Sequence, residues 1–84
     1  MFAYPDEKEY KELNKKDKAS VKEAIRLFQG NQFDPKIRNH PLQGKLAGHR
    51  SIDAGFDLRI VCKEQGNYTY VLFLQVGSHS QLYG

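Results

Sequence analysis

The chain has 84 residues and a mass of 9.7 kDa, and its 13 Lys and Arg against 10 Asp and Glu give a formal net charge of +3. This length suits one domain over residues 1–84 and excludes a cofactor domain joined to a substrate domain. Apolar residues make up 39% and charged residues 27%, which excludes a disordered tail. No apolar run reaches the ~18 residues of a membrane span. The single cysteine and the absence of a recognisable export leader predict a cytoplasmic protein.

Two helices are expected in the first third of the chain. Residues 2–4 suit a brief strand, and a proline with two acidic residues suits the first turn of a helix over residues 6–15. A second helix is expected to pair with the first. Ser20 or Asp17 is its expected N-terminal cap, and a left-handed Gly30 is its expected end. The second helix has one apolar face, with residues at i, i+3, i+4 and i+7: Val21, Ala24, Ile25 and Phe28.

The second half of the chain reads as a sheet. Residues 31–46, rich in Asn, Asp, Pro and Gly, predict a connecting loop. Period-two alternation then predicts three strands with a hairpin turn at 64–67: residues 49–54, 57–63 and 68–76. The last strand is apolar on both faces, which predicts a place in the centre of the sheet. The expected class is α+β, with two N-terminal helices packed on a small, mostly antiparallel sheet.

Positive charge is concentrated in the middle of the chain. Residues 36–63 hold six basic and two acidic residues, a net charge of +4, while the other residues sum to −1. Such a stretch suits RNA, DNA or an acidic partner chain, or else a solvated surface. The sequence has no GxGxxG, GxxxxGK[ST] or HExxH motif, and a lone cysteine cannot form a thiolate zinc site. We therefore expect neither a cofactor nor a metal, and we expect Cys62 to be a core residue.

Residues able to carry acid–base chemistry surround the predicted sheet. His40 precedes it, Asp57 and Arg59 begin its middle strand, and His79 and Tyr83 follow its last strand. In an antiparallel meander, the start of the middle strand lies beside the end of the last one, so these groups can meet. Imidazole, carboxylate and guanidinium together suit metal-free cleavage of RNA. The structural alternative is a loop histidine, an Asp57–Arg59 ion pair and a packed tyrosine.

Four blocks then follow one another in the sequence: residues 39–44 (NHPLQG), 48–52 (GHRSI), 57–61 (DLRIV) and 76–83 (VGSHSQLY). They resemble the successive motifs of the RelE/ParE toxin superfamily, and above all its YafQ-like mRNA interferases. The resemblance covers residues 36–83 by motif and the two helices by layout. It implies the RelE-like microbial RNase fold and a type II toxin that enters the ribosomal A site and cuts translated mRNA through the 2′-OH. It also implies a cognate antitoxin, mRNA and ribosome as partners, without a membrane or a cofactor.

The resemblance implies roles at matching positions. His40 matches the loop histidine, Asp57 the strand carboxylate, and Arg59 the strand arginine that binds the scissile phosphate in the RelE and YoeB branches. His79 matches a proton-transfer histidine of the YafQ branch, and Tyr83 matches the terminal aromatic residue. Four further cations are expected to hold RNA backbone: Lys36, Arg38, Lys45 and Arg50. Arg50 has the equal alternative of bracing the sheet through an ion pair.

One position departs from the family pattern. Asp53 stands where YafQ-like chains often have a further histidine. The proton-transfer roles stay open, because His79 can be the acid with Asp53 or Asp57 as the base, or His79 and His40 can share the work. Two other functions also stay open. One is a ParE-like toxin that inhibits gyrase by binding, and the presence of the histidines argues against it. The other is an inactive, antitoxin-bound relative, and Asp53 favours it.

Overall fold

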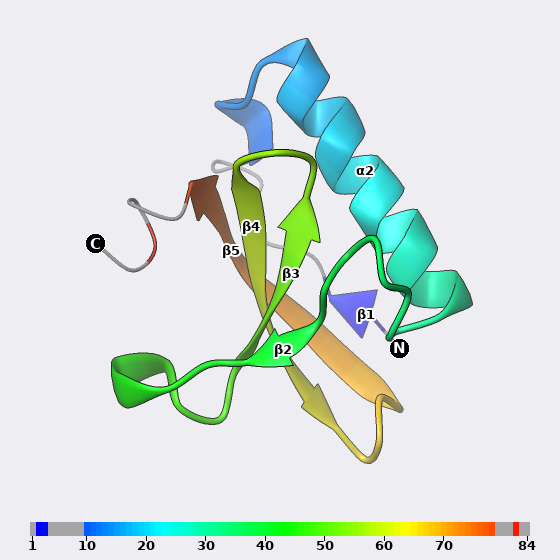
Figure 1. Ribbon diagram of the computed structural model, residues 1–84, viewed down its shortest axis with the longest axis vertical. Coiled ribbons are helices and arrows are strands. Elements are labelled where there is room, and N and C mark those ends of the chain that lie inside the picture. Colours follow the sequence, from blue (N-terminus) through cyan, green and yellow to red (C-terminus); the bar gives the residue numbers. More distant parts are fainter. Residues whose placement is uncertain (1, 4–9, 79–81, 83–84) are drawn as a thin grey trace.

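The computed structural model describes residues 2–3, 10–78 and 82, and in it one helix lies across one face of a five-stranded sheet (Figure 1). The helix is α2 (Lys15–Gly30), and a short 3₁₀ helix, η1 (Gly44–Leu46), follows the second strand. The strands are β1 (Phe2–Ala3), β2 (His40–Pro41), β3 (Arg50–Ala54), β4 (Leu58–Gln65) and β5 (Tyr70–Ser78). Within the described ranges, no helix is long and apolar enough to cross a membrane.

The sheet has the strand order β1-β5-β4-β3-β2. β1 runs parallel to β5, and the other neighbouring strands are antiparallel. The predicted α+β class is therefore confirmed, and β1 confirms the brief strand expected at the N-terminus. β2 lies inside the predicted loop, because two residues that include a proline carry almost no strand signal.

The core lies between α2 and the sheet. α2 buries the predicted residues Val21, Ala24 and Phe28 against it. The ring of Phe28 meets the ring of Phe73 of β5 edge-on, with 5.5 Å between centroids. Cys62 is fully buried in this core, as predicted. The apolar period of the second predicted helix therefore identified the face that packs on the sheet.

The two ends of α2 differ from the prediction. Its N-terminal cap is Asn14, whose Oδ1 accepts a hydrogen bond from the backbone N–H of Asp17 at 2.7 Å. The expected caps Asp17 and Ser20 therefore lie inside the helix. The sequence does not distinguish them from Asn14, because Asn caps a helix as well as Asp and Ser do and because the charged first turn has no apolar residue to mark where the helix begins. The helix does end at Gly30, but Gly30 is not left-handed. Its cap is the extended Asn31, whose N–H donates to a carbonyl of the last turn.

Residues 6–9 of the first predicted helix, 6–15, lie outside the described residues, and the rest of it is wrong beyond residue 11. Residues 10–11 are helical, and a turn separates them from α2. Tyr10 and Leu13 pack against the core from this segment.

β5 is not the central strand that the sequence predicts. The strand order puts β4 in the middle of the sheet, and β5 has only the two-residue β1 on its other side. Tyr70 and Leu72 of β5 are 57% and 43% exposed, because α2 covers only one face of the sheet. A strand that is apolar on both faces is thus buried on one face alone.

Candidate functional site

The face of the sheet turned away from α2 carries the central part of the predicted site. Strand alternation places Ser51 and Asp53 of β3 and Arg59 and Val61 of β4 on this face, which we call the distal face. Ser51 and Val61 are buried. The side chains of Asp53 and Arg59 remain 12% and 20% exposed, so they form the charged part of this face.

Strand register arranges the distal face in two neighbouring rows. In one row, Asp53 lies opposite Arg59. In the other, His40 of β2 lies opposite Ser51. Same-face residues that are neighbours along one strand are about 7 Å apart. His40 therefore lies one row away from the Asp53–Arg59 pair, and β2 is the element that puts it there.

Arg59 is held at two of its three nitrogens. Its Nε lies 3.1 Å from Oδ1 of Asp53, and its Nη1 donates to the carbonyl oxygen of Leu58 at 3.0 Å. The other oxygen of Asp53, Oδ2, lies 3.6 Å from Nε of Arg38. The carboxylate of Asp53 therefore sits between two guanidinium groups.

Arg38 reaches this carboxylate from the loop before β2. Its φ of 48° lies in the left-handed region, which is costly for a residue with a side chain. The loop is tied to β3 because the backbone N–H of Asp53 donates to the carbonyl oxygen of Ile37 at 2.6 Å. The strained backbone thus brings a second cation to the distal face.

The hydrogen bond of His40 fixes which of its nitrogens can accept a proton. Nδ1 lies 2.7 Å from the carbonyl oxygen of Arg38. A carbonyl only accepts, so Nδ1 carries the hydrogen and the neutral ring has Nε2 as its acceptor. His40 is exposed, so Nε2 is open to a substrate.

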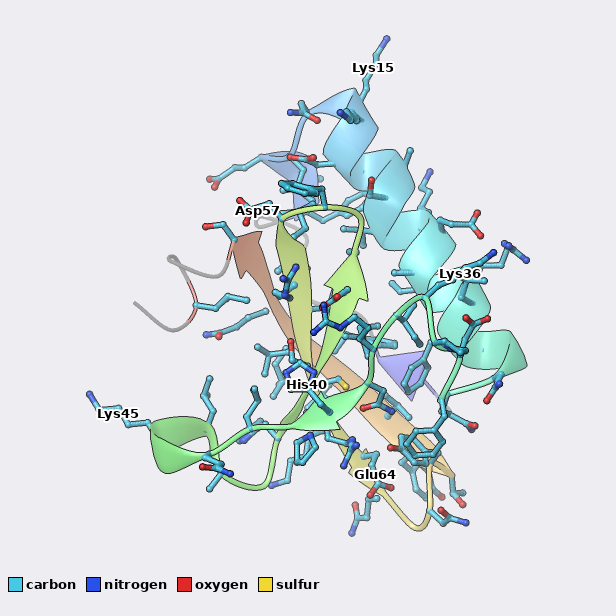
Figure 2. All side chains as sticks on the ribbon, viewed as in Figure 1. Lys15, Lys36, His40, Lys45, Asp57 and Glu64 are labelled. Atoms are coloured by element: carbon cyan, nitrogen blue, oxygen red, sulfur yellow. The ribbon has the colours of Figure 1, made fainter. Side chains whose placement is uncertain are left out.

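Asp57 lies apart from this group. It belongs to the turn between β3 and β4, because Ala54 pairs directly with Leu58 and leaves residues 55–57 as the loop. Asp57 lines an open cleft at the start of α2, and Figure 2 shows it just before the start of β4, whereas His40 lies over the middle of the sheet. The structural alternative for these two residues, an Asp57–Arg59 ion pair, is therefore wrong, and Arg59 pairs with Asp53 instead.

His79 and Tyr83 lie outside the described residues. The strand that leads to them is described up to Ser78, which pairs with Leu58, and Gly77 pairs with Arg59. The end of β5 therefore lies beside the start of β4, as the meander predicts. The roles of His79 and Tyr83 stay predictions.

Arg50 is one of the four predicted RNA-binding cations, and it faces an aromatic cluster. Its Nε donates to Oδ1 of Asn39 at 2.6 Å, and its guanidinium lies 5.8 Å from the ring centroid of Phe33. Asn39 in turn donates to the hydroxyl of Tyr68. These contacts favour the bracing alternative, with an amide in place of the expected acidic partner.

The remaining cations do not form one patch. Arg38 lies beside Asp53. Lys36 is exposed next to α2, and Lys45 is exposed on η1. Figure 2 shows Lys36 and Lys45 on opposite sides of the molecule. Their predicted contacts with RNA therefore cannot all belong to one short strand.

Two further observations concern the cysteine and the groups that could ligate a metal. Burial raises the pKa of the Cys62 thiol to about 11, so Cys62 is a core residue and no nucleophile. In the described part of the chain, no group of three or more His, Cys, Asp or Glu side chains is placed to hold a metal ion.

The fold is that of small bacterial toxins of known structure. The crystal structure of YafQ from Escherichia coli BL21(DE3) matches with a TM-score of 0.81 and 22% identity over 100% of this chain and 98% of that one. The E. coli DinJ–YafQ toxin–antitoxin complex gives 0.78 and 24% over 100% and 97%. A copper-bound mutant toxin from Helicobacter pylori gives 0.74 and 25% over 98% and 98%. No curated protein matches the chain significantly.

The family follows from the sequence itself. The model of the family described as "Bacterial toxin of type II toxin-antitoxin system, YafQ" matches residues 4–84. The chain therefore belongs to the YafQ family of type II toxins, as its four sequence blocks predict.

Proposed function

We propose that the chain is a ribosome-dependent endoribonuclease that cuts translated mRNA in the cytoplasm and is held inactive by a cognate antitoxin. The observation that carries the nuclease is on the distal face, where a fixed Arg59 lies one row from His40 and its open Nε2. Membership of the YafQ family supports the toxin class. DinJ is the antitoxin in the complex of E. coli YafQ, and a partner of this kind is expected here.

The reaction is a displacement at one phosphorus atom of the RNA. A base takes the proton of the 2′-OH, and the 2′-oxygen forms a bond to phosphorus. The bond from phosphorus to the 5′-oxygen breaks, and an acid gives that oxygen a proton. The products are a 2′,3′-cyclic phosphate and a free 5′-OH, so the step consumes no co-reactant.

The residues divide this work by their chemistry. Arg59 binds phosphate oxygens and stabilises the charge that develops on them. His40, through Nε2, is one proton-transfer group, and His79, which follows Ser78 at the end of β5, is the other. Tyr83 stacks on a base. Asp57 is left at the rim of the site, in the turn before β4.

Replacement of Arg59 tests the nuclease. Induced expression of the wild-type chain in a bacterium is expected to arrest growth and to create new RNA ends inside translated codons, which primer extension detects. Arg59→Ala removes the guanidinium that stabilises the phosphate and should lower cleavage about 10²- to 10³-fold. Arg26→Ala is the matched control, because Arg26 is an exposed guanidinium on α2. It should leave both arrest and cleavage unchanged.

Each other outcome selects another function. Arrest without cuts in mRNA would indicate a binding toxin of the ParE type. A folded product that causes no arrest would indicate the inactive relative, which has one observation in its favour: Asp53 already contacts Nε of both arginines. Relief of arrest by a co-expressed neighbouring reading frame would identify the antitoxin.

A further inference from the structure

Asp53 joins the polar groups of the distal face to one another. Its Oδ1 contacts Nε of Arg59 at 3.1 Å, and its Oδ2 lies 3.6 Å from Nε of Arg38. Its backbone N–H donates to the carbonyl oxygen of Ile37 at 2.6 Å. One residue of β3 thus holds an arginine from the next strand, an arginine from a loop, and that loop itself.

The contacts of Asp53 leave the outer nitrogens of both arginines for a ligand. Asp53 meets each arginine at Nε, and Leu58 takes only Nη1 of Arg59. Among the described residues, no hydrogen bond or ion pair is made by Nη2 of Arg59 or by either Nη of Arg38, and the side chain of Arg38 is 74% exposed. Two guanidinium groups and one carboxylate leave a charge of +1, which still attracts a phosphate.

The same network reaches His40. The carbonyl oxygen of Arg38 accepts the hydrogen bond from Nδ1 of His40. Arg38 has a left-handed backbone here, and its exposed side chain lies 3.6 Å from Oδ2 of Asp53. Loss of this ion pair is expected to let the backbone of Arg38 relax and the imidazole of His40 turn.

We propose that Asp53 is a positioning residue of the RNA-cleaving site, which holds Arg59 and Arg38 by their Nε atoms so that their Nη atoms present a paired cation to one phosphate. The proposal rests on the nuclease function proposed above. In this proposal Asp53, the residue that departs from the family pattern, is neither a base nor a substitute for the histidine. It contacts the two arginines and acts through them.

Kinetics with two variants test the role. In a translation reaction with a defined mRNA, Asp53→Ala should lower kcat about 10- to 100-fold, because the phosphate-binding group is no longer held in place. KM should not rise, because the variant gains a positive charge near the RNA. Asp53→Asn keeps an oxygen that can accept from Nε of Arg59, so its loss should be smaller. A kcat of Asp53→Ala at or above the wild-type value would overturn the proposal, because the carboxylate would then compete with phosphate.

A charge-matched control separates position from charge. Glu23→Gln also removes one carboxylate that contacts an arginine, Arg26, but on the exposed side of α2. It should leave kcat and KM unchanged. An equal loss in Glu23→Gln and Asp53→Asn would assign the effect to net charge and would overturn the positioning role.

A spectroscopic readout is independent of RNA cleavage. In nitrogen-edited NMR spectra, the Nε–H of Arg59 should exchange slowly with water in the wild type and in Glu23→Gln, and fast in Asp53→Ala. The ¹⁵N shifts of neutral His40 should show the hydrogen on Nδ1 in the wild type and a mixture of tautomers in Asp53→Ala. Unchanged signals in Asp53→Ala would overturn the positioning role whatever the activity. A wild-type chain that cuts no RNA would overturn the nuclease function, while these signals would still report on the contact.

Discussion

Cys62 is the single cysteine, and its burial in the core gives it a titration that can be measured. Burial raises the pKa of its thiol to about 11, from an ordinary value of 9.0. Between these two values the unfolded chain releases the proton and the folded chain keeps it, so the free energy of unfolding falls as the pH rises. From pH 8 to pH 10 the wild type should lose roughly 1 kcal/mol more than Cys62→Ala does.

Urea unfolding at several pH values measures this difference. Groups that titrate in both proteins cancel in the comparison, so only the thiol contributes to it. Parallel pH profiles for wild type and Cys62→Ala would show that the thiol ionises as easily in the folded chain as in the unfolded one. The ordinary reactivity of Cys62 toward iodoacetamide at pH 8 should likewise appear only after unfolding.

Single residues also show which parts of the site could be predicted from the sequence and which could not. The sequence identified Arg59 and His40, which share the distal face, but it placed Asp57 on that face beside Arg59 because both were assigned to one strand. A strand that begins at Leu58 instead would have set Asp53 opposite Arg59. The contact of Arg38 with Asp53 had no such signal, because it depends on one left-handed residue in a loop.

At the scale of elements, the turn between β3 and β4 depends on Gly55. Its φ is +81°, and a Cβ there would lie 3.0 Å from Oγ of Ser20 and 3.3 Å from its Cβ, on the side of α2. Gly55→Ala therefore combines left-handed strain with a close contact, and should lower the free energy of unfolding by about 2–3 kcal/mol.

Gly48→Ala is the matched control for this turn. Its φ is +88°, but a Cβ there would have nothing within 4 Å. It should cost only the strain, about 1 kcal/mol. Denaturant unfolding of both variants measures the difference. Equal losses would contradict the idea that the turn is pressed against α2.

Helices and strands were predictable where burial of one face makes apolar residues recur at regular intervals in the sequence. The apolar face of α2 and the alternation of β3 and β4 gave helix and strands in the right order. The cap at Asn14 was missed because three polar residues within two turns can each cap a helix. β2 was missed because a pair of residues has no period, although it places His40 on the distal face.

At the scale of the whole molecule, the fold divides the positive charge that the sequence concentrates between residues 36 and 63. Arg38 and Arg59 meet on the distal face, and Arg50 turns to Asn39 and Phe33. Lys36 and Lys45 are left exposed on opposite sides of the molecule. A net charge summed along the chain predicts attraction to RNA but cannot say which face the RNA covers.

The salt dependence of RNA binding distinguishes these faces. The logarithm of the binding constant falls with the logarithm of salt concentration by about 0.7 for each phosphate neutralised on a single strand. An RNA strand on the distal face can reach Lys45 of η1 but not Lys36 beside α2. Lys45→Ala should therefore reduce the slope by about 0.7, and Lys36→Ala should leave it unchanged.

Titrations of a 2′-deoxy-substituted, uncleavable RNA measure both slopes. The salt concentration is varied from about 50 to about 200 mM, a range over which the affinity for nucleic acid changes strongly. Equal reductions of the slope in both variants would mean that the RNA continues around the molecule to α2. A reduction in Lys36→Ala alone would place the RNA on the side of the helix and would contradict the site built on Arg59 and His40.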